Sequence, residues 1–187
     1  MKKVIMCLLL VGLVSIPLMA QDKDRVEVFG GYQYLHIGQH TSVDMNSQAF
    51  NGWNAAAAYN LNKNIGVEGD FSGTYASPSG ISWHVFTYSG GPIVSMPTGR
   101  IKPFAHVLFG GIKLSASESG ASVSWNGFTT MFGGGVDVKA NKNISVRLAQ
   151  VDWLYYHFGS KAIGTVLFPS FSGSNNVRIS TGVVFHF

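Results

Sequence analysis

The sequence has little cysteine, little charge and no long apolar run outside its first residues, and each shortage excludes a class of protein. The only cysteine among 187 residues is Cys7, which lies inside the apolar stretch of an expected export signal. The rest of the chain therefore offers no disulfide, no thiol nucleophile and no cysteine-based zinc site. Beyond residue 20 there is no run of about 18 apolar residues, so no membrane-spanning helix is predicted.

Charge is scarce and nearly balanced. Charged residues make up 12% of the chain, against about 25% in a typical soluble domain. The formal net charge of +4 includes Lys2 and Lys3, and without them 11 basic residues face 9 acidic ones. Such a scattered balance does not suggest a nucleic-acid partner. Aromatic residues reach 13% and there are 23 glycines, so the chain is also too apolar and too aromatic to be disordered.

Residues 1–20 have the three parts of a secretory signal peptide. Lys2 and Lys3 supply the positive start, residues 4–14 form the apolar stretch, and Ala20 precedes the expected cut. We therefore expect a cleaved signal peptide over residues 1–20 and one domain over residues 21–187.

Hydrophobicity alternates with a period of two through much of the remaining chain. From Val177 to Phe187 apolar residues recur at every second position, and Arg178 and His186 fall between them. Residues 26–34 and 65–75 follow the same pattern. Because successive strand residues point to opposite faces, each segment predicts a strand with an apolar face and a face that carries the polar and charged residues.

Eight strands are predicted, with alternating short and long connections between them. Their ranges are 25–36, 49–60, 65–76, 83–94, 101–114, 127–138, 144–157 and 176–187. The connections after the second, fourth and sixth strands are short, and those after the first, fifth and seventh are long. The run Asn-Lys-Asn-Ile occurs at 62–65 and again at 141–144, which indicates two equivalent turns at one end of a barrel. Strands of about 11 residues suit a tilted bilayer crossing.

The alternation is compatible with two kinds of barrel, in which the apolar face of the strands points in opposite directions. A soluble, lipocalin-like barrel has an apolar interior, whereas a membrane barrel has an apolar exterior and a polar interior. A soluble surface needs about 25–35% charged residues, far more than this chain supplies. We therefore predict an all-β protein, an eight-stranded antiparallel up-and-down transmembrane β-barrel. Seven outward aromatic residues are candidates for the girdles at the two membrane interfaces: Tyr32, Tyr34, Trp53, Tyr59, Tyr75, Trp153 and Tyr155.

The inward positions carry most of the charged residues of the strands. They are Glu27, Glu68, Asp70, Lys102, Asp137, Arg147 and Arg178. Side chains just fill the interior of an eight-stranded barrel, so we expect carboxylate–guanidinium pairs that close the lumen. A gated ion path is the alternative. Arg147 and Asp152 are five residues apart, and a one-residue bulge near Ala149 would bring both inside. The six histidines lack metal-ligand spacing, and no metal or cofactor is predicted.

Several segments resemble a known family. The C-terminal run, with Val183, Phe185 and Phe187 pointing outward, resembles the insertion signal of Gram-negative outer-membrane barrels. The runs 29–32 and 132–138 are similar to segments of the small OmpA-like, eight-stranded barrel domains. This resemblance covers residues 21–187 without the peptidoglycan-binding domain that follows many such barrels. It implies an outer-membrane location, a mostly closed interior, and contacts with membrane lipid, lipopolysaccharide and the barrel-assembly machinery.

The expected role is structural or surface-interactive, in a monomeric, non-enzymatic barrel whose long outer connections meet an extracellular partner. A lipid A-modifying enzyme is the first rival, and it would need an acid beside Ser82 and His84, with Ser89 nearby. The His-x-Ser-Asn motif of the deacylases and the Gly-x-Ser-x-Gly elbow are both missing. A narrow channel for ions or small hydrophobic molecules is the second rival, for which the sequence offers no specific feature.

Overall fold

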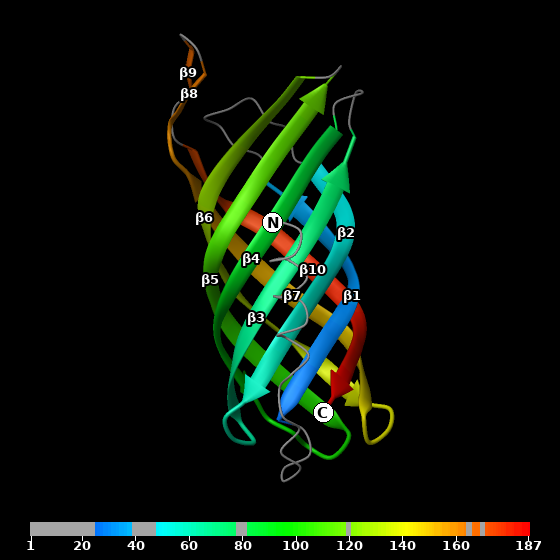
Figure 1. The fold of residues 1–187 in the computed structure, drawn as a ribbon. Coiled ribbons are helices and arrows are strands. Elements are labelled where there is room, and N and C mark those ends of the chain that lie inside the picture. Colours follow the sequence, from blue (N-terminus) through cyan, green and yellow to red (C-terminus); the bar gives the residue numbers. More distant parts are fainter. Residues whose placement is uncertain (1–24, 39–47, 78–81, 119–120, 164–165, 169–170) are drawn as a thin grey trace, which may run out of the picture.

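Eight long antiparallel strands close into a barrel in the order β1-β10-β7-β6-β5-β4-β3-β2 (Figure 1). This computed structural model describes residues 25–38, 48–77, 82–118, 121–163, 166–168 and 171–187. The barrel strands are β1 (Val26–Ile37), β2 (Gln48–Asn60), β3 (Ile65–Ala76), β4 (Ser82–Ser95), β5 (Ile101–Glu118), β6 (Ala121–Lys139), β7 (Ile144–Phe158) and β10 (Phe171–His186). The predicted fold class is confirmed. In these ranges no helix is long and apolar enough to cross a membrane.

The three short connections lie at one end of the barrel, together with Arg25 and the C-terminal Phe187 (Figure 1). The Asn62 Oδ1 atom accepts hydrogen bonds from the backbone N–H groups of Asn64 and Ile65. The Asn141 Oδ1 atom accepts one from the backbone N–H of Asn143. The repeated sequence thus forms two similar turns at one end, as predicted. We call this the turn end and the opposite one the loop end. In outer-membrane barrels the short turns are periplasmic.

β5 and β6 are longer than the sequence predicts. They pair as far as Glu118 and Ala121, so the expected long connection after the fifth strand is wrong. Residues 115–124 are rich in serine and alanine, which have little strand propensity of their own. Cross-strand hydrogen bonding and pairs such as Leu114 with Trp125 override that preference.

The last connection is also shorter than predicted, because β10 begins at Phe171 rather than at residue 176. Phe171 pairs with Phe158, and the register shifts between Gly173 and Asn176. Between β7 and β10 the chain forms a separate two-stranded sheet of β8 (Lys161–Ile163) and β9 (Val166–Phe168). This small sheet stands at the loop end (Figure 1).

β7 contains the bulge that the sequence predicts. Val136 pairs with Ala149 and Asp137 pairs with Arg147, so Leu148 has no partner on β6. The pairing with β10 shifts at the same place. Both Arg147 and Asp152 consequently lie inside the barrel.

Candidate functional site: the barrel interior

The outward face of the strands is apolar. The seven predicted girdle residues all lie on this face, and six of them are more than 40% exposed. Tyr59 lies beside the turn at residues 61–64, whereas Tyr75 and Tyr155 lie toward the loop end. The insertion-signal residues Phe185 and Phe187 are also exposed outward, and Val183 is half-buried in the same register. Their roles in the membrane stay predictions.

The middle of the interior is a network centred on Arg178. Its guanidinium donates to Asp70 Oδ1 at 2.7 Å and to Asp152 Oδ2 at 2.6 Å. All three side chains are fully buried. His106 joins the network from β5, with its Nε2 atom 2.8 Å from Asp152 Oδ1 and its Nδ1 atom 3.1 Å from Glu68 Oε2. One arginine therefore joins strands β3, β7 and β10 across the lumen.

A second group of charges lies closer to the turn end. Arg147 donates to both carboxylate oxygens of Asp137, at 2.8 and 3.1 Å. Its guanidinium lies between the rings of Phe29 and Phe104, 4.4 and 4.2 Å from their centroids. Lys102 forms an ion pair with Glu27. The bidentate and stacked geometry fixes Arg147 in a way that a lysine could not reproduce.

The structure brings all seven predicted interior charges into ion pairs or hydrogen bonds with partners inside the barrel. Three further members of the network are Gln150, which donates to Asp152 at 2.8 Å, Asn54, which donates to Asp70 at 2.8 Å, and His106. Each occupies an inward position. The strand alternation places Asn54 and His106 inside, but their partners depend on strand register.

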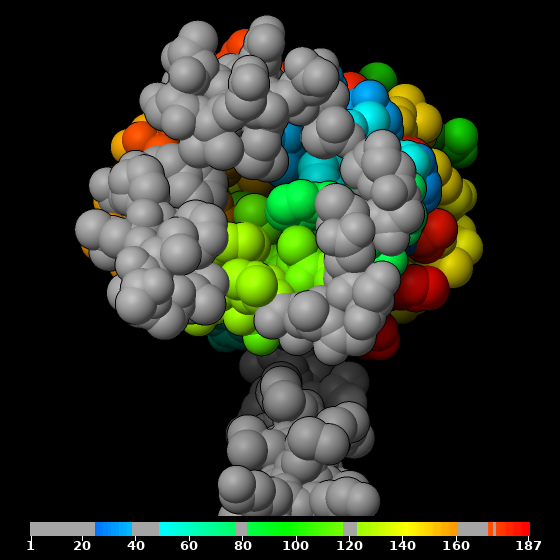
Figure 2. All heavy atoms as spheres, turned by 90° about the horizontal axis from the view of Figure 1, so that it is seen from above, coloured from blue at the N-terminus to red at the C-terminus, as the bar shows by residue number. Residues whose placement is uncertain are grey.

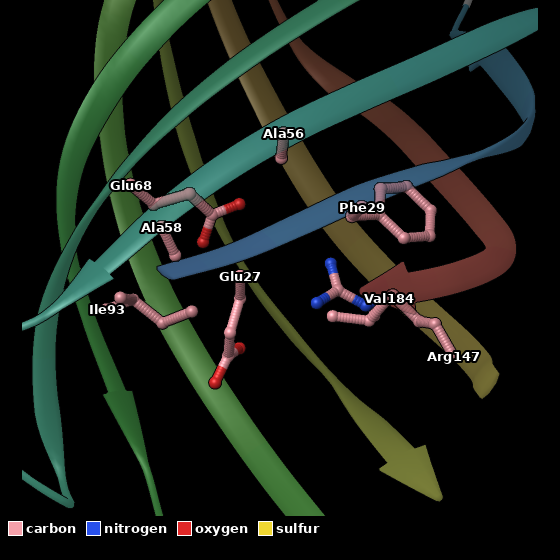
Figure 3. A pocket seen from close by; sticks show the side chains of 8 residues that line it. All are labelled: Glu27, Phe29, Ala56, Ala58, Glu68, Ile93, Arg147 and Val184. Carbon is pink, nitrogen blue, oxygen red and sulfur yellow. The ribbon is translucent and has the colours of Figure 1, made fainter. Parts of the chain in front are cut away.

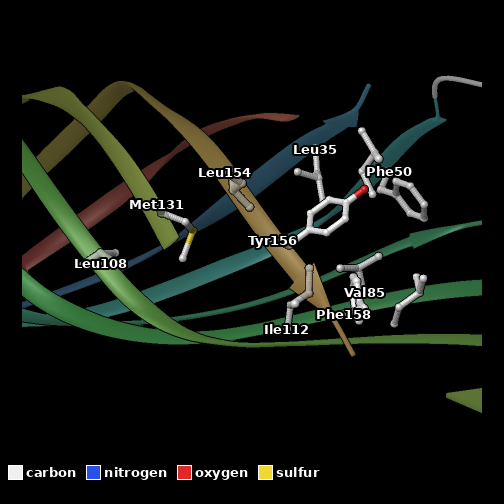
Figure 4. Close-up of a cluster of buried hydrophobic side chains, with 11 residues drawn as sticks. Leu35, Phe50, Val85, Leu108, Ile112, Met131, Leu154, Tyr156 and Phe158 are labelled. Carbon is white, nitrogen blue, oxygen red and sulfur yellow. The ribbon is translucent and has the colours of Figure 1, made fainter. Parts of the chain in front are cut away.

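The interior toward the loop end is mainly apolar, with the buried polar side chains of Thr74, Thr129 and Asn176 among its apolar ones, which corrects the expectation of a lumen closed mostly by polar and charged side chains. A buried cluster fills it (Figure 4), which we call the apolar layer. Its members are Leu35, Ile37, Phe50, Val85, Leu108, Ile112, Leu114, Met131, Leu154, Tyr156 and Phe158. Seen from the loop end, green-coloured side chains of the segment from β3 to β6 lie in the middle of the barrel (Figure 2).

The sequence contained a signal for this layer. Residues 153–158 are apolar or aromatic at nearly every position, so a strand there has two apolar faces, one toward lipid and one inward. Alternation disappears in such a segment, and a search for a period of two cannot assign the inward side chains.

Ser82, His84 and Ser89, which a lipid A-modifying enzyme was expected to use, do not form a site with an acid among the described side chains. His84 lies on the outward face of β4 and packs edge-on against Tyr75, with ring centroids 5.2 Å apart. Ser89 lies on the opposite, inward face. The acids whose side chains the structure describes all lie inside the barrel, away from Ser82 and His84. In the same parts of the chain, no three His, Cys, Asp or Glu side chains are placed to hold a metal ion.

A closed eight-stranded barrel with an apolar outer face and a charged core defines a class, the small transmembrane β-barrels. Residues 6–187 match the family model of the outer membrane protein beta-barrel domain. The chain belongs to this family, and it is an integral protein of the Gram-negative outer membrane. No characterised protein matches it significantly by sequence.

Three solved structures illustrate the similarity of fold. Neisserial surface protein A superimposes with a TM-score of 0.65 at 14% identity, over 89% of this chain and 100% of that one. Ail, the attachment invasion locus protein of Yersinia pestis, gives a TM-score of 0.57 at 16% identity, again over 89% and 100%. The N-terminal barrel domain of Pseudomonas aeruginosa OprF gives 0.57 at 10% identity, over 89% and 100%. At these identities the likeness concerns the fold alone.

Proposed function

We propose that this protein is a non-conducting outer-membrane scaffold whose loop end contacts extracellular partners. The observation that carries the proposal is the filling of the interior by two successive layers of the chain's own side chains. Arg178 and Asp152 in the charged half are 0% exposed, and so are Leu108 and Met131 in the apolar layer. A permeating ion would have to separate buried ion pairs and then cross an apolar section, and both steps are costly.

The closed lumen is tested by ion release from liposomes. Purified protein is reconstituted into vesicles loaded with potassium chloride, and potassium release is followed with an ion-selective electrode. We expect release no faster than from protein-free vesicles. Rapid release in proportion to the amount of folded protein would contradict the closed lumen and favour the channel.

The contact role rests on the shape of the loop end. β5 and β6 continue as a paired ribbon from Leu114 and Trp125 to Glu118 and Ala121. A rigid barrel that presents such a ribbon is a common arrangement for recognition. A structural neighbour, Ail, was crystallised with the heparin analogue sucrose octasulfate, so a sulfated polysaccharide is the first probe to use.

A charge reversal at the base of the ribbon tests this contact. Residues 115–124 carry no Lys, Arg or His, and Lys113 is an exposed basic residue directly before Leu114. We expect vesicles carrying the original protein to be retained on immobilised heparin and those carrying Lys113→Glu to pass through, because a polyanion is attracted by basic groups. Folding of both proteins is checked by the shift in gel mobility on boiling. Equal retention, or none for either, would contradict the contact with sulfated polysaccharide.

We also propose that residues 1–20 are removed as a signal peptide and that the barrel-assembly machinery recognises the C-terminal strand. The apolar outer face would then meet lipid and lipopolysaccharide around a monomer. Deletion of Phe187 should lower the amount of protein in the outer membrane, while the mass of the exported chain still shows loss of the signal. An unchanged outer-membrane level would contradict this role of the C-terminal strand.

A further inference from the structure

The interior pocket near the turn end offers a ligand little to bind (Figure 3). Its lining consists of Glu27, Glu68, Arg147 and five apolar side chains. Each of the three charged groups already has a partner inside the barrel. Side chains that can meet a ligand are found instead on the outward face, near the loop end.

Four side chains that carry N–H groups form a continuous row across the outward face of β4, β5, β6 and β7. They are His84, Lys113, Asn126 and His157, one on each strand. Lys113 pairs directly with Asn126. His84 pairs with Ser115, which is two residues from Lys113. His157 likewise pairs with Phe128, two residues from Asn126. Diagonal neighbours of this kind are about 7–8 Å apart. We call this row the basic arc.

The basic arc lies at the loop-end edge of the apolar band. His84 is two residues from the start of β4, and His157 is one residue from the end of β7. The next outward residues toward the turn end are aromatic and exposed: Phe86 on β4, Phe128 on β6 and Tyr155 on β7. In outer-membrane barrels aromatic residues flank the apolar band at the membrane interfaces. The arc therefore lies at the level of the lipid headgroups.

The chemistry of the basic arc suits an anion with several oxygen acceptors. Lys113 is exposed and permanently charged, and its ammonium group has three N–H donors. The imidazoles of His84 and His157 and the amide of Asn126 add donors on either side of it. The acids whose side chains the structure describes all lie inside the barrel, so none of them competes for these donors. Phosphate groups accept such charge-assisted hydrogen bonds well.

We propose that the basic arc binds the phosphate groups of a phosphorylated glycolipid in the loop-end leaflet. The acyl chains of that lipid lie along the exposed aromatic side chains next to the arc, such as Phe86 and Tyr155. A soluble anion would use the donors but not this apolar surface, so the juxtaposition of the two favours a lipid. The inference rests on the proposed contact between the outer face and lipopolysaccharide, and it names the side chains that recognise the headgroup.

Thermal unfolding of the folded barrel in a neutral detergent tests the basic arc. The protein is heated with diphosphorylated lipid A or with the same lipid after removal of both phosphates, and the midpoint is read from the loss of the folded band on a gel. Both lipids have the same acyl chains, so a difference between them reports the phosphates. At ten times its Kd, the phosphorylated lipid should give a midpoint roughly 3–6 °C above that with the dephosphorylated lipid.

Three other outcomes of this experiment would overturn the proposal in different ways. An equal rise with both lipids would mean that the outer face meets lipid but the arc does not recognise phosphate. No rise with either lipid, compared with detergent alone, would also contradict the proposed lipid contact of the outer face. An equal rise with inorganic phosphate at the same concentration would assign the arc to soluble anions.

Variants on the outward face locate the contact. The triple variant His84→Phe, Lys113→Met and His157→Phe removes donors and charge but keeps side chains of similar size, and it should lose the phosphate-dependent rise. Lys63→Met is the matched control, because it removes an exposed lysine at the turn end, and it should keep the rise. If the triple variant does not fold, Lys113→Met alone replaces it and should at least halve the rise. A full rise without these side chains, or an equal loss in Lys63→Met, would overturn the proposal.

The contact with phosphorylated lipid can be separated from the contact with heparin, although Lys113 takes part in both tests. The lipid test contains no polysaccharide, and the heparin test contains no phosphorylated lipid when its vesicles are made from neutral lipid. His84→Phe with His157→Phe retains Lys113, and this double variant should lose part of the phosphate-dependent rise. An unchanged rise in the double variant would mean that Lys113 acts alone, and it would overturn the arc as a site.

Discussion

The two halves of the barrel interior have the same strands around them and opposite chemistry. In the charged half, which extends from the middle of the interior to the turn end, Arg178 lies between two carboxylates. Toward the loop end, Leu108 lies among aliphatic and aromatic side chains. Both residues are fully buried. In the charged half each group depends on a partner, because loss of one leaves a buried charge. In the apolar layer each side chain contributes mainly its own burial and packing. The interior is thus filled by two mechanisms that respond differently to substitution.

The largest effect is expected when Arg178 is replaced. Arg178→Met keeps the bulk but leaves Asp70 and Asp152 without their common cation, so the free energy of unfolding should fall by about 3–5 kcal/mol. Urea unfolding of the refolded barrel in lipid vesicles measures this loss. Arg100→Met, in an exposed turn at the turn end, is the control and should change little. A similar small change in both variants would mean that the network does not depend on Arg178.

A smaller loss is expected from a truncation in the apolar layer. Leu108→Ala removes buried aliphatic carbon and leaves a cavity, which should lower the free energy of unfolding by roughly 3 kcal/mol. The same urea titration applies, with Val107→Ala on the outward face of β5 as its matched control. If Leu108→Ala and Val107→Ala lose equal stability, Leu108 is not part of a packed layer.

The stacked arginine provides a test within the charged half. Phe104→Leu keeps an apolar wall but removes one of the two rings that contact the Arg147 guanidinium. We expect a loss of about 1 kcal/mol in the free energy of unfolding. Phe109→Leu, at a lipid-facing position that is 50% exposed, provides the comparison. No difference between the two variants would show that the stacking contributes nothing.

The smallest effect is expected from removal of the bulge residue. Deleting Leu148 would make β7 regular and still leave Arg147 and Asp152 on the inward face, because the residue without a β6 partner is lost. The Thr181 hydroxyl, which donates to the Arg147 carbonyl at 2.9 Å, would have to adjust. Deleting Val151 instead inverts the alternation on one side of the deletion and should prevent folding. Boiling-dependent gel mobility distinguishes the outcomes, and failure of both deletions would contradict this assignment of Leu148.

The sequence predicted those features that depend on alternation within one strand. Charges such as Glu68 and Arg178 lie opposite apolar residues in their strands, so their inward position followed directly. The spacing of Arg147 and Asp152 predicted the bulge because five residues cannot fit a regular period of two. The C-terminal and girdle residues were assigned to the outward face by the same alternation.

Other features depend on contacts between strands and could not be predicted in this way. The apolar layer has no alternation to detect, and the β5–β6 ribbon is stabilised by cross-strand pairing rather than by the preferences of its serines and alanines. The placement of Ala58 between Glu27 and Glu68 likewise depends on the register of β2 with its two neighbours. Neither glutamate predicts the other from the sequence, since they lie on separate strands.

Two layers of side chains are proposed to close the barrel, and the current across a planar lipid bilayer tests this closure most directly. Folded protein is inserted into a bilayer in potassium chloride, with insertion confirmed by protease protection of the same protein in vesicles. If both layers close the interior, the original protein gives no conductance steps. Steady, voltage-independent steps from the folded barrel would contradict it and establish a continuous ion path through the interior.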